Sequence, residues 1–257
     1  MARVLIVLPQ RDYDPTEAGV PWQLLERSGH QVSFATPDGQ TASADPRVLS
    51  GTGFGIWRPL LMADARGRLA HQTMINSPAF ARPLSYQQID LDQFDGLLFP
   101  GGHAPGMKPY LESTELQQIV RTAFERRLPI GAICHGVLVL SRSTGVNGRP
   151  LLCGRKVTAL TRFQELAAWL MTRLWLGSYY RTYPTTVQSE VSAALARPGD
   201  FSTGPIALRR DDPQHLRRGY CVVDDHLVTA RWPGDAHRFA AEFAALLDTP
   251  TGAPAGA

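Results

Sequence analysis

The stretch Ile130-Gly131-Ala132-Ile133-Cys134-His135-Gly136 decides the fold, because it joins a buried strand to a helix through a cysteine. Residues 129–133 form a short apolar run, which is typical of a strand covered on both faces. The apolar residues 137–140 predict that the chain continues as a helix. A side chain at such a turn projects at the carboxyl edge of the sheet, where open α/β folds bind their ligands.

Cys134 is therefore predicted to be a nucleophile. The N–H groups at the start of the following helix lie beside the sulfur, and their field favours the thiolate. Gly131 and Gly136 relieve crowding on the two sides of the bend. A buried structural cysteine is the alternative, and the adjacent His135 favours the catalytic interpretation.

Strand-like and helix-like segments alternate outward from this turn. Gly29 follows the first helix, where a left-handed cap is wanted, and Asp224-Asp225 is expected to turn a β-hairpin. The predicted strands are 3–8, 31–36, 95–99, 129–133 and 156–160 and the hairpin 219–223 with 226–230, and the predicted helices are 21–28, 112–127 and 235–247. Repeated β-α-β units predict an α/β fold with a mainly parallel sheet and helices on both faces.

A single domain is expected over residues 1–248. Residues 50–90 lack a clean period and are predicted to be an inserted cap. Residues 164–200 form a helical segment rich in tryptophan and tyrosine, which either packs in the core and at an interface or lines the substrate site. The Pro/Gly/Ala-rich tail 249–257 is predicted to be disordered.

Composition excludes several classes of protein. The 257 residues are 44% hydrophobic and 19% charged, which argues against intrinsic disorder. The net charge of +3 is carried by dispersed arginines, so no nucleic-acid partner is expected. No run of about 18 apolar residues occurs, so no membrane partner is expected either. Three cysteines suit neither a disulfide framework nor a zinc knuckle, and a cytoplasmic location is expected.

A second motif, Pro100-Gly101-Gly102-His103, ends the strand before the elbow. A glycine pair at this place lets a backbone N–H point into the crevice. The N–H groups of Gly102 and His135 could together receive a developing oxyanion. Alone, the motif would indicate only a turn.

These motifs together resemble the DJ-1/PfpI superfamily. The resemblance rests on PGGH at 100–103 and AICHG at 132–136, and it extends over residues 3–247. Asp14-Pro15-Thr16-Glu17 and the segment 34–39 are similar to the Hsp31-like branch. The resemblance implies a flavodoxin-like three-layer sandwich, a homodimer, and cofactor-independent chemistry on small carbonyl compounds, as in glyoxalase III members that convert methylglyoxal to lactate.

The resemblance also implies roles for individual residues. Cys134 matches the family nucleophile, His135 the adjacent base, and Glu17 the acid beside the sulfur, reached from the loop after the first strand. Glu165 is predicted to orient the histidine, because it is the only carboxylate in the matching segment 158–165. Glu17 could instead serve only the helix dipole, and Glu165 could merely occupy the first turn of the aromatic helix.

Gly101 and His103 are expected to contact the small-molecule substrate. No metal is predicted, because the remaining histidines are scattered without ligand spacing. A glutaminase is not expected, since the chain lacks the downstream His-x-Glu pair of class I glutamine amidotransferases. Two other functions stay open: a cysteine-dependent hydrolase or hydratase of an amide, ester, isonitrile or biosynthetic intermediate, and a stress-related chaperone that uses exposed apolar surface.

Overall fold

A seven-stranded sheet in the order β5-β3-β1-β6-β7-β9-β8 forms the centre of the computed structural model, which describes residues 1–206 and 209–249. Every neighbouring pair is parallel except β8 and β9, which form the predicted hairpin. Its strands are β1 (Arg3–Val7), β3 (Gln31–Thr36), β5 (Leu84–Ser85), β6 (Gly96–Phe99), β7 (Ile130–Ile133), β8 (Cys221–Asp224) and β9 (Leu227–Ala230). β2 (Arg11–Tyr13) and β4 (Ser43–Ala44) pair separately.

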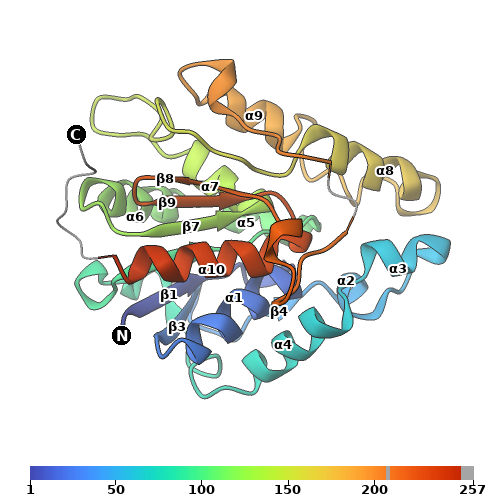
Figure 1. Cartoon of the computed structure of the whole chain (residues 1–257), viewed down its shortest axis with the longest axis horizontal. Helices are drawn as coiled ribbons and strands as arrows, with labels where there is room; N and C mark the ends of the chain where they lie inside the picture. The colour runs from blue at the N-terminus through green and yellow to red at the C-terminus, as the bar shows by residue number, and fades with distance from the viewer. Residues whose placement is uncertain (207–208, 250–257) are drawn as a thin grey trace.

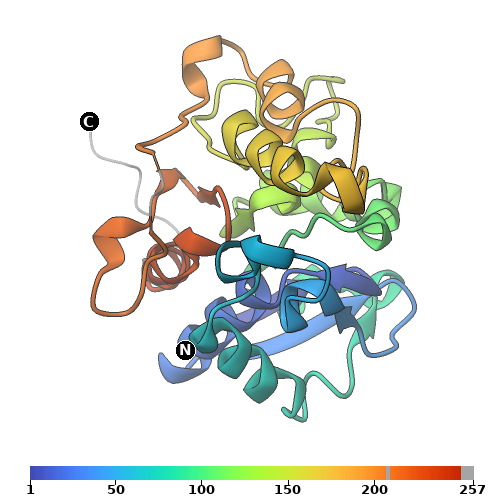
Figure 2. The same ribbon diagram turned by 90° about the vertical axis from the view of Figure 1, so that its right-hand side faces the viewer.

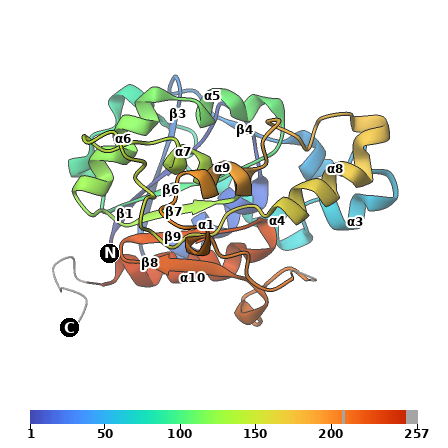
Figure 3. The ribbon, with the colours of Figure 1, turned by 90° about the horizontal axis from the view of Figure 1, so that it is seen from above.

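Helices cover both faces of the sheet, which confirms the three-layer α/β prediction (Figure 3). The helices α1 (Pro15–Arg27), α4 (Ala65–Ile75) and α10 (Ala236–Leu247) lie on one side, and α5 (Lys108–Leu111), α6 (Thr114–Glu125) and α7 (Val137–Ser141) lie on the other. The core is continuous through the sheet because β1 is central: its residues Val4 to Val7 have no exposed surface.

A smaller apolar cluster joins two segments beyond the sheet. Figures 1 and 2 show α8 (Arg162–Leu176) above α2 (Pro46–Ser50) and α3 (Arg58–Leu61), with α9 (Val187–Ala193) beside α8. Phe54 and Ala63 on one side pack with Ala168 and Tyr180 on the other. Only the first part of 50–90 covers α8 in this way, because later residues form α4 against α1 and the edge strand β5.

Short 3₁₀ helices complete the secondary structure: η1 (Gly55–Trp57), η2 (Tyr86–Gln88), η3 (Leu91–Gln93), η4 (Pro105–Met107), η5 (Cys134–Gly136), η6 (Pro198–Asp200), η7 (Leu216–Arg218) and η8 (Pro233–Asp235).

Two predicted elements were wrong. Residues 156–160 form no strand; Val157 makes an isolated bridge to Phe201, and β9 occupies the place beside β7. The first helix begins at Pro15 rather than at residue 21, because Asp14 accepts hydrogen bonds from the N–H groups of Thr16 and Glu17.

The tail predicted to be disordered lies outside the described residues from residue 250 onward. Within residues 1–206 and 209–249, no helix combines the length and the apolar character that crossing a bilayer requires.

Candidate active site

Cys134 lies on a strained elbow between β7 and η5, as the sequence predicts. Its φ is +58°, a backbone conformation that costs a non-glycine residue energy and is typical of nucleophile elbows. The next turn passes so close to β6 that a Cβ at Gly136 would lie 2.1 Å from the carbonyl oxygen of Phe99. The elbow therefore depends on glycine at position 136.

Glu17 reaches the elbow from the first turn of α1, so the expectation of a loop position was wrong. Its Oε2 accepts a hydrogen bond of 2.8 Å from the N–H of Gly101. Burial, and next the charge of Asp14, raise the pKa of Glu17 well above its usual range. This shift favours the protonated form of Glu17, which can donate a proton toward the sulfur.

The pKa of the Cys134 thiol is also raised well above its ordinary value. Burial is the largest cause, the charges of Glu17 and Asp14 add to it, and the N–H of His135 lowers it. The expected stabilisation of the thiolate by a helix N-terminus is therefore outweighed in this closed site, since η5 and α7 are short and the side chain is fully buried. Cys134 therefore rests as a thiol, and a base would have to remove its proton before the sulfur could attack a substrate.

His135 is placed to be that base. Its Nδ1 lies 3.5 Å from Cys134 Sγ, and its Nε2 lies 3.2 Å from the hydroxyl oxygen of Thr182. Thr182 donates its own hydroxyl proton to the carbonyl oxygen of His103 at 2.7 Å, so it accepts from His135 Nε2–H. Burial lowers the pKa of His135 well below its usual value, which keeps the ring neutral with a free lone pair on Nδ1 facing the thiol.

The structure does not bring Glu165 to His135, which corrects the predicted third member of the site. Its Oε2 accepts a hydrogen bond of 2.9 Å from the N–H of Val187, and its Oε1 lies 3.6 Å from Arg181 Nε. Glu165 therefore ties α8 to the start of α9. The place behind the histidine is taken by Thr182, which lies outside the segment that the family motif aligns.

Gly101 and Gly102 stand beside the elbow where an oxyanion would form. A Cβ at Gly101 would lie 2.7 Å from the His135 nitrogen, so only glycine lets the two loops approach. The N–H of Gly101 is used by Glu17, and the N–H of His135 points at the sulfur. An oxyanion hole made from the Gly102 and His135 amides remains a prediction.

His103 also lies at the site, as its place in the motif 100–103 beside the elbow leads us to expect. Its ring meets the rings of His135 and Tyr180 edge-on, with centroids 4.9 Å and 4.8 Å apart. Burial lowers the pKa of His103 to about 4, so it is neutral. In the described part of the chain, His103, Cys134 and His135 bring potential ligand atoms within 4.8 Å of one another. The spacing of the histidines in the sequence therefore does not indicate which of them lie together in the structure.

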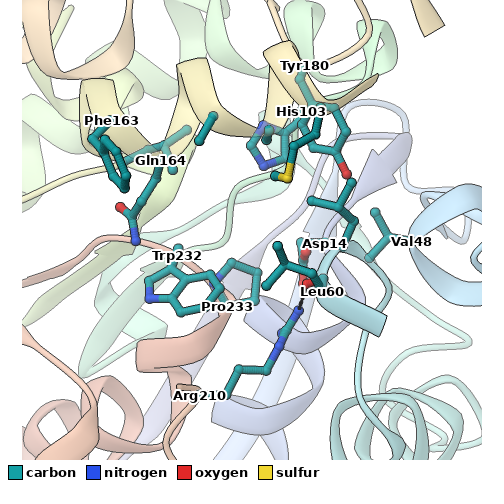
Figure 4. Close-up of a pocket in the computed structure, with 15 residues that line it drawn as sticks. Asp14, Val48, Leu60, His103, Phe163, Gln164, Tyr180, Arg210, Trp232 and Pro233 are labelled. Carbon is teal, nitrogen blue, oxygen red and sulfur yellow. Dashed lines mark hydrogen bonds between the residues drawn. The ribbon is translucent and has the colours of Figure 1, made fainter. Parts of the chain in front are cut away.

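A pocket of about 170 Å³ opens next to this cluster (Figure 4). Asp14 and His103 line it at the side of the elbow, while Phe163, Gln164 and Trp232 line the opposite side. His103 contacts both the pocket and His135, so it lies between the pocket and the nucleophile. A pocket bounded by α8 and by residues near 210 and 232 had no local motif that could reveal it.

Comparisons with known proteins match this chain over most of its length. A protein of Pyrococcus abyssi named as a deglycase is 32% identical over 243 residues, which cover 95% of this chain and 98% of that protein. The Rapid Encystment Protein 24 KDa of Francisella tularensis superposes with a TM-score of 0.69 at 18% identity, covering 97% of this chain and 100% of that one. Glyoxalase III of Candida albicans superposes with a TM-score of 0.67 at 18% identity, covering 95% and 97%.

Other curated relatives match over less of their length. The chain spans 50% of a Schizosaccharomyces pombe protein and 34% of DJ-1 homolog D of Arabidopsis thaliana. A family model described as ThiJ/PfpI family-like matches residues 8–199. The chain therefore belongs to the ThiJ/PfpI family of the DJ-1/PfpI superfamily, on its Hsp31-like branch.

Proposed function

We propose that this protein is a cofactor-independent cysteine enzyme that converts small 2-oxo aldehydes to 2-hydroxy acids, with methylglyoxal and lactate as the simplest pair. One observation supports this above all: a buried thiol on a strained elbow, with the neutral base His135 and the protonated acid Glu17 against it. The names of a deglycase and a glyoxalase III among its relatives agree with chemistry on reactive carbonyls.

The reaction begins when His135 Nδ1 takes the thiol proton and the sulfur adds to the aldehyde carbon. The resulting oxyanion lies within reach of the Gly102 and His135 amides. The protonated His135 then returns its proton to this oxygen, which gives a neutral hemithioacetal and restores the neutral imidazole. Glu17 gives its proton to the ketone oxygen, and its carboxylate takes the proton from the hemithioacetal carbon, which produces an enediol. Glu17 then returns a proton to the former ketone carbon, and the hydroxyl proton on the first carbon leaves to His135.

These steps leave a thioester at the first carbon and a secondary alcohol at the second. Two electrons have moved from one carbon to its neighbour, so no external oxidant or reductant is consumed. Water attacks the thioester as the Glu17 carboxylate takes its proton, and the protonated His135 gives its proton to the leaving sulfur. These transfers release the 2-hydroxy acid and restore the Cys134 thiol, the neutral His135 and the protonated Glu17. The raised pKa of Glu17 suits this role, because a carboxyl group whose protonated form is favoured can give a proton and, as the carboxylate, take one back.

Lactate formation from methylglyoxal, without added cofactor, tests the proposal. The wild type and the Cys221→Ser variant should both form lactate, since Cys221 is a buried cysteine in β8 outside the site. Cys134→Ser should lose at least about 1,000-fold in kcat/KM. Retained activity in Cys134→Ser, or loss in Cys221→Ser alone, would contradict the proposal.

A holdase activity is a second candidate function. It is favoured by apolar side chains that are exposed on α8 and close to it. Phe163, Leu170 and Leu174 are 72%, 57% and 86% exposed, and Ile56 is 83% exposed. An exposed patch of this kind is typical of an interaction surface. The holdase function predicts that Cys134→Ser still suppresses the aggregation of a client protein and that Leu174→Glu does not. Equal suppression by the two variants would contradict it.

A further inference from the structure

Polar groups line one side of the pocket beside the elbow, with Val48 and Leu60 beside them, and the opposite side is apolar apart from Gln164. On the polar side, Figure 4 shows the guanidinium of Arg210 reaching toward Asp14, with His103 farther along. Leu160, Phe163 and Met171 are apolar members of the lining, and Trp232 and Pro233 form another apolar part. Polar groups that converge at one end of an apolar pocket are the usual means of orienting a ligand.

Arg210 carries an unused hydrogen-bond donor in this pocket. Its Nη2 donates to the carbonyl oxygens of Leu60 and Met62, each at 3.2 Å, and its guanidinium lies 5.4 Å from the centre of the Trp232 ring. Its Nη1 is buried and has no hydrogen-bond partner among the residues that the structure describes. A buried donor without a partner is costly, so a ligand acceptor at this atom would bind favourably.

The charges around Arg210 favour a neutral hydrogen-bond acceptor over an anionic one. Arg210 and Asp14 attract each other across the polar side, so the pair together presents little net charge. A carboxylate bound to Arg210 would face the Asp14 carboxylate, whereas a carbonyl oxygen would not. The donor is thus better suited to a ketone or aldehyde oxygen than to an acid.

The volume of the pocket indicates the size of the apolar group that the ligand carries. A dry cavity of about 150 Å³ lined by apolar side chains is large enough to bind benzene, and this pocket measures about 170 Å³. The methyl group of methylglyoxal would leave most of such a space unfilled. Phe163 and Trp232 contribute aromatic side chains to the lining, and aromatic rings pack well against a flat apolar group.

We propose that the preferred substrate is a 2-oxo aldehyde whose ketone carries an aryl or branched alkyl group, held in the apolar side of the pocket while Arg210 Nη1 donates to the ketone oxygen. This inference rests on the proposed function. It makes Arg210 a substrate-binding residue, and it makes methylglyoxal the smallest substrate rather than the preferred one.

The first test compares initial rates with phenylglyoxal and methylglyoxal. Wild type should show a kcat/KM at least about tenfold higher for phenylglyoxal. Arg210→Gln should lower kcat/KM about tenfold for both aldehydes, because both present the ketone oxygen to the charged donor that this variant loses. Arg209→Gln is the matched control, since Arg209 is exposed and does not line the pocket, and it should keep both values of kcat/KM.

The second test measures binding without turnover. Benzamide, which joins a ring to a neutral carbonyl, should bind the Cys134→Ser protein more tightly than acetamide or benzoate, and Arg210→Gln should weaken benzamide about tenfold. Tighter binding of benzoate, no difference between benzamide and acetamide, or equal effects of Arg210→Gln and Arg209→Gln would overturn the inference.

The two tests separate this inference from the proposed function. Cys134-dependent turnover of methylglyoxal without any gain for phenylglyoxal would overturn the substrate preference and leave the chemistry standing. Arg210-dependent benzamide binding with no turnover of either aldehyde would support the assignment of the pocket and overturn the proposed chemistry.

Discussion

The direction of each hydrogen bond around His135 determines what the residue can do. Thr182 must give its only proton to the carbonyl of His103, and this fixes the tautomer of His135 that presents a lone pair to Cys134. Many cysteine and serine enzymes use a carboxylate for this purpose. A hydroxyl fixes the tautomer without adding a negative charge, so the imidazolium formed during the reaction is stabilised less.

Thr182→Val should lower kcat/KM about tenfold, the lower end of what the loss of an orienting partner costs. The effect should fall on kcat rather than KM, because Thr182 does not line the pocket. Thr182→Ser keeps the hydroxyl and should restore activity. Equal losses in the valine and serine variants would show that Thr182 acts through packing alone.

Glu17→Gln should increase the stability of the protein at higher pH while it lowers the activity. Folding holds Glu17 at a raised pKa, so the native state keeps a proton that the unfolded chain releases above its own pKa of about 4.3. The stability contributed by this proton is fully present below that value and is lost as the pH rises toward the native pKa. Glutamine does not titrate, so the variant should become more stable than wild type as the pH rises from 4 to 8.

Thermal unfolding of the two proteins at pH 4.5 and pH 8 measures this difference. The variant should gain in Tm only at the higher pH, and its kcat should fall at least about 100-fold. A difference in Tm that is the same at both pH values would contradict the protonated state of Glu17.

Residue roles could be predicted from the sequence only where a short motif carried them. Cys134 and His135 are adjacent, and Glu17 follows the first strand in a recognisable tetrapeptide. Thr182 and Arg210 belong to irregular segments whose positions depend on tertiary packing. Glu165 is predicted because it is the only carboxylate in the matching segment 158–165, but the first turn of α8 points it toward Val187.

At the level of elements, buried strands were the most predictable part of the fold. Continuous apolar runs gave β1, β3, β6 and β7 to within about one residue. Residues 156–160 carry the same kind of apolar pattern, and Val157 to Leu160 are indeed buried. Burial alone does not make a strand, however, and the pairing edge of β7 was already occupied by β9.

The elbow is the element on which the site depends, and Gly136→Ala tests it. The new methyl group would overlap the carbonyl oxygen of Phe99, so the loop or β6 must shift. We expect a loss of about 3 kcal/mol in the free energy of unfolding and loss of activity. Gly199→Ala is the control, because no atom lies within 4 Å of the position its methyl group would take. Urea unfolding of both variants measures the effect, and similar losses would contradict it.

On the scale of the whole molecule, the site is assembled from four distant parts of the chain. The start of α1, the loop after β6, the elbow after β7 and the loop after α8 all meet at Cys134. Parallel strands explain three of these, because their carboxyl ends share one edge of the sheet. The fourth, with Thr182 and Tyr180, is held there by the apolar cluster between α8 and residues 48–63.

A buried ion pair joins the end of β9 to the start of α10. Arg231 and Asp235 are almost fully buried, and two hydrogen bonds of 2.8 Å and 2.9 Å join them. Asp235→Asn would leave the guanidinium without a counter-charge and should reduce the free energy of unfolding by about 3 kcal/mol. Asp92 forms an exposed ion pair with Arg126, and Asp92→Asn should reduce the free energy of unfolding by less than about 1 kcal/mol. Chemical denaturation of the two variants makes the comparison, and equal costs would contradict the role given to the buried pair.

The most direct test of the central claim is the covalent state of Cys134 during turnover. Protein quenched with methylglyoxal in excess can be measured by intact mass spectrometry, and the modified residue can be located by peptide mapping. The account predicts an adduct on Cys134 in wild type that disappears when the substrate is exhausted, and no adduct or turnover in Cys134→Ser. Turnover by wild type with Cys134 unmodified, or an unchanged rate in Cys134→Ser, would contradict it.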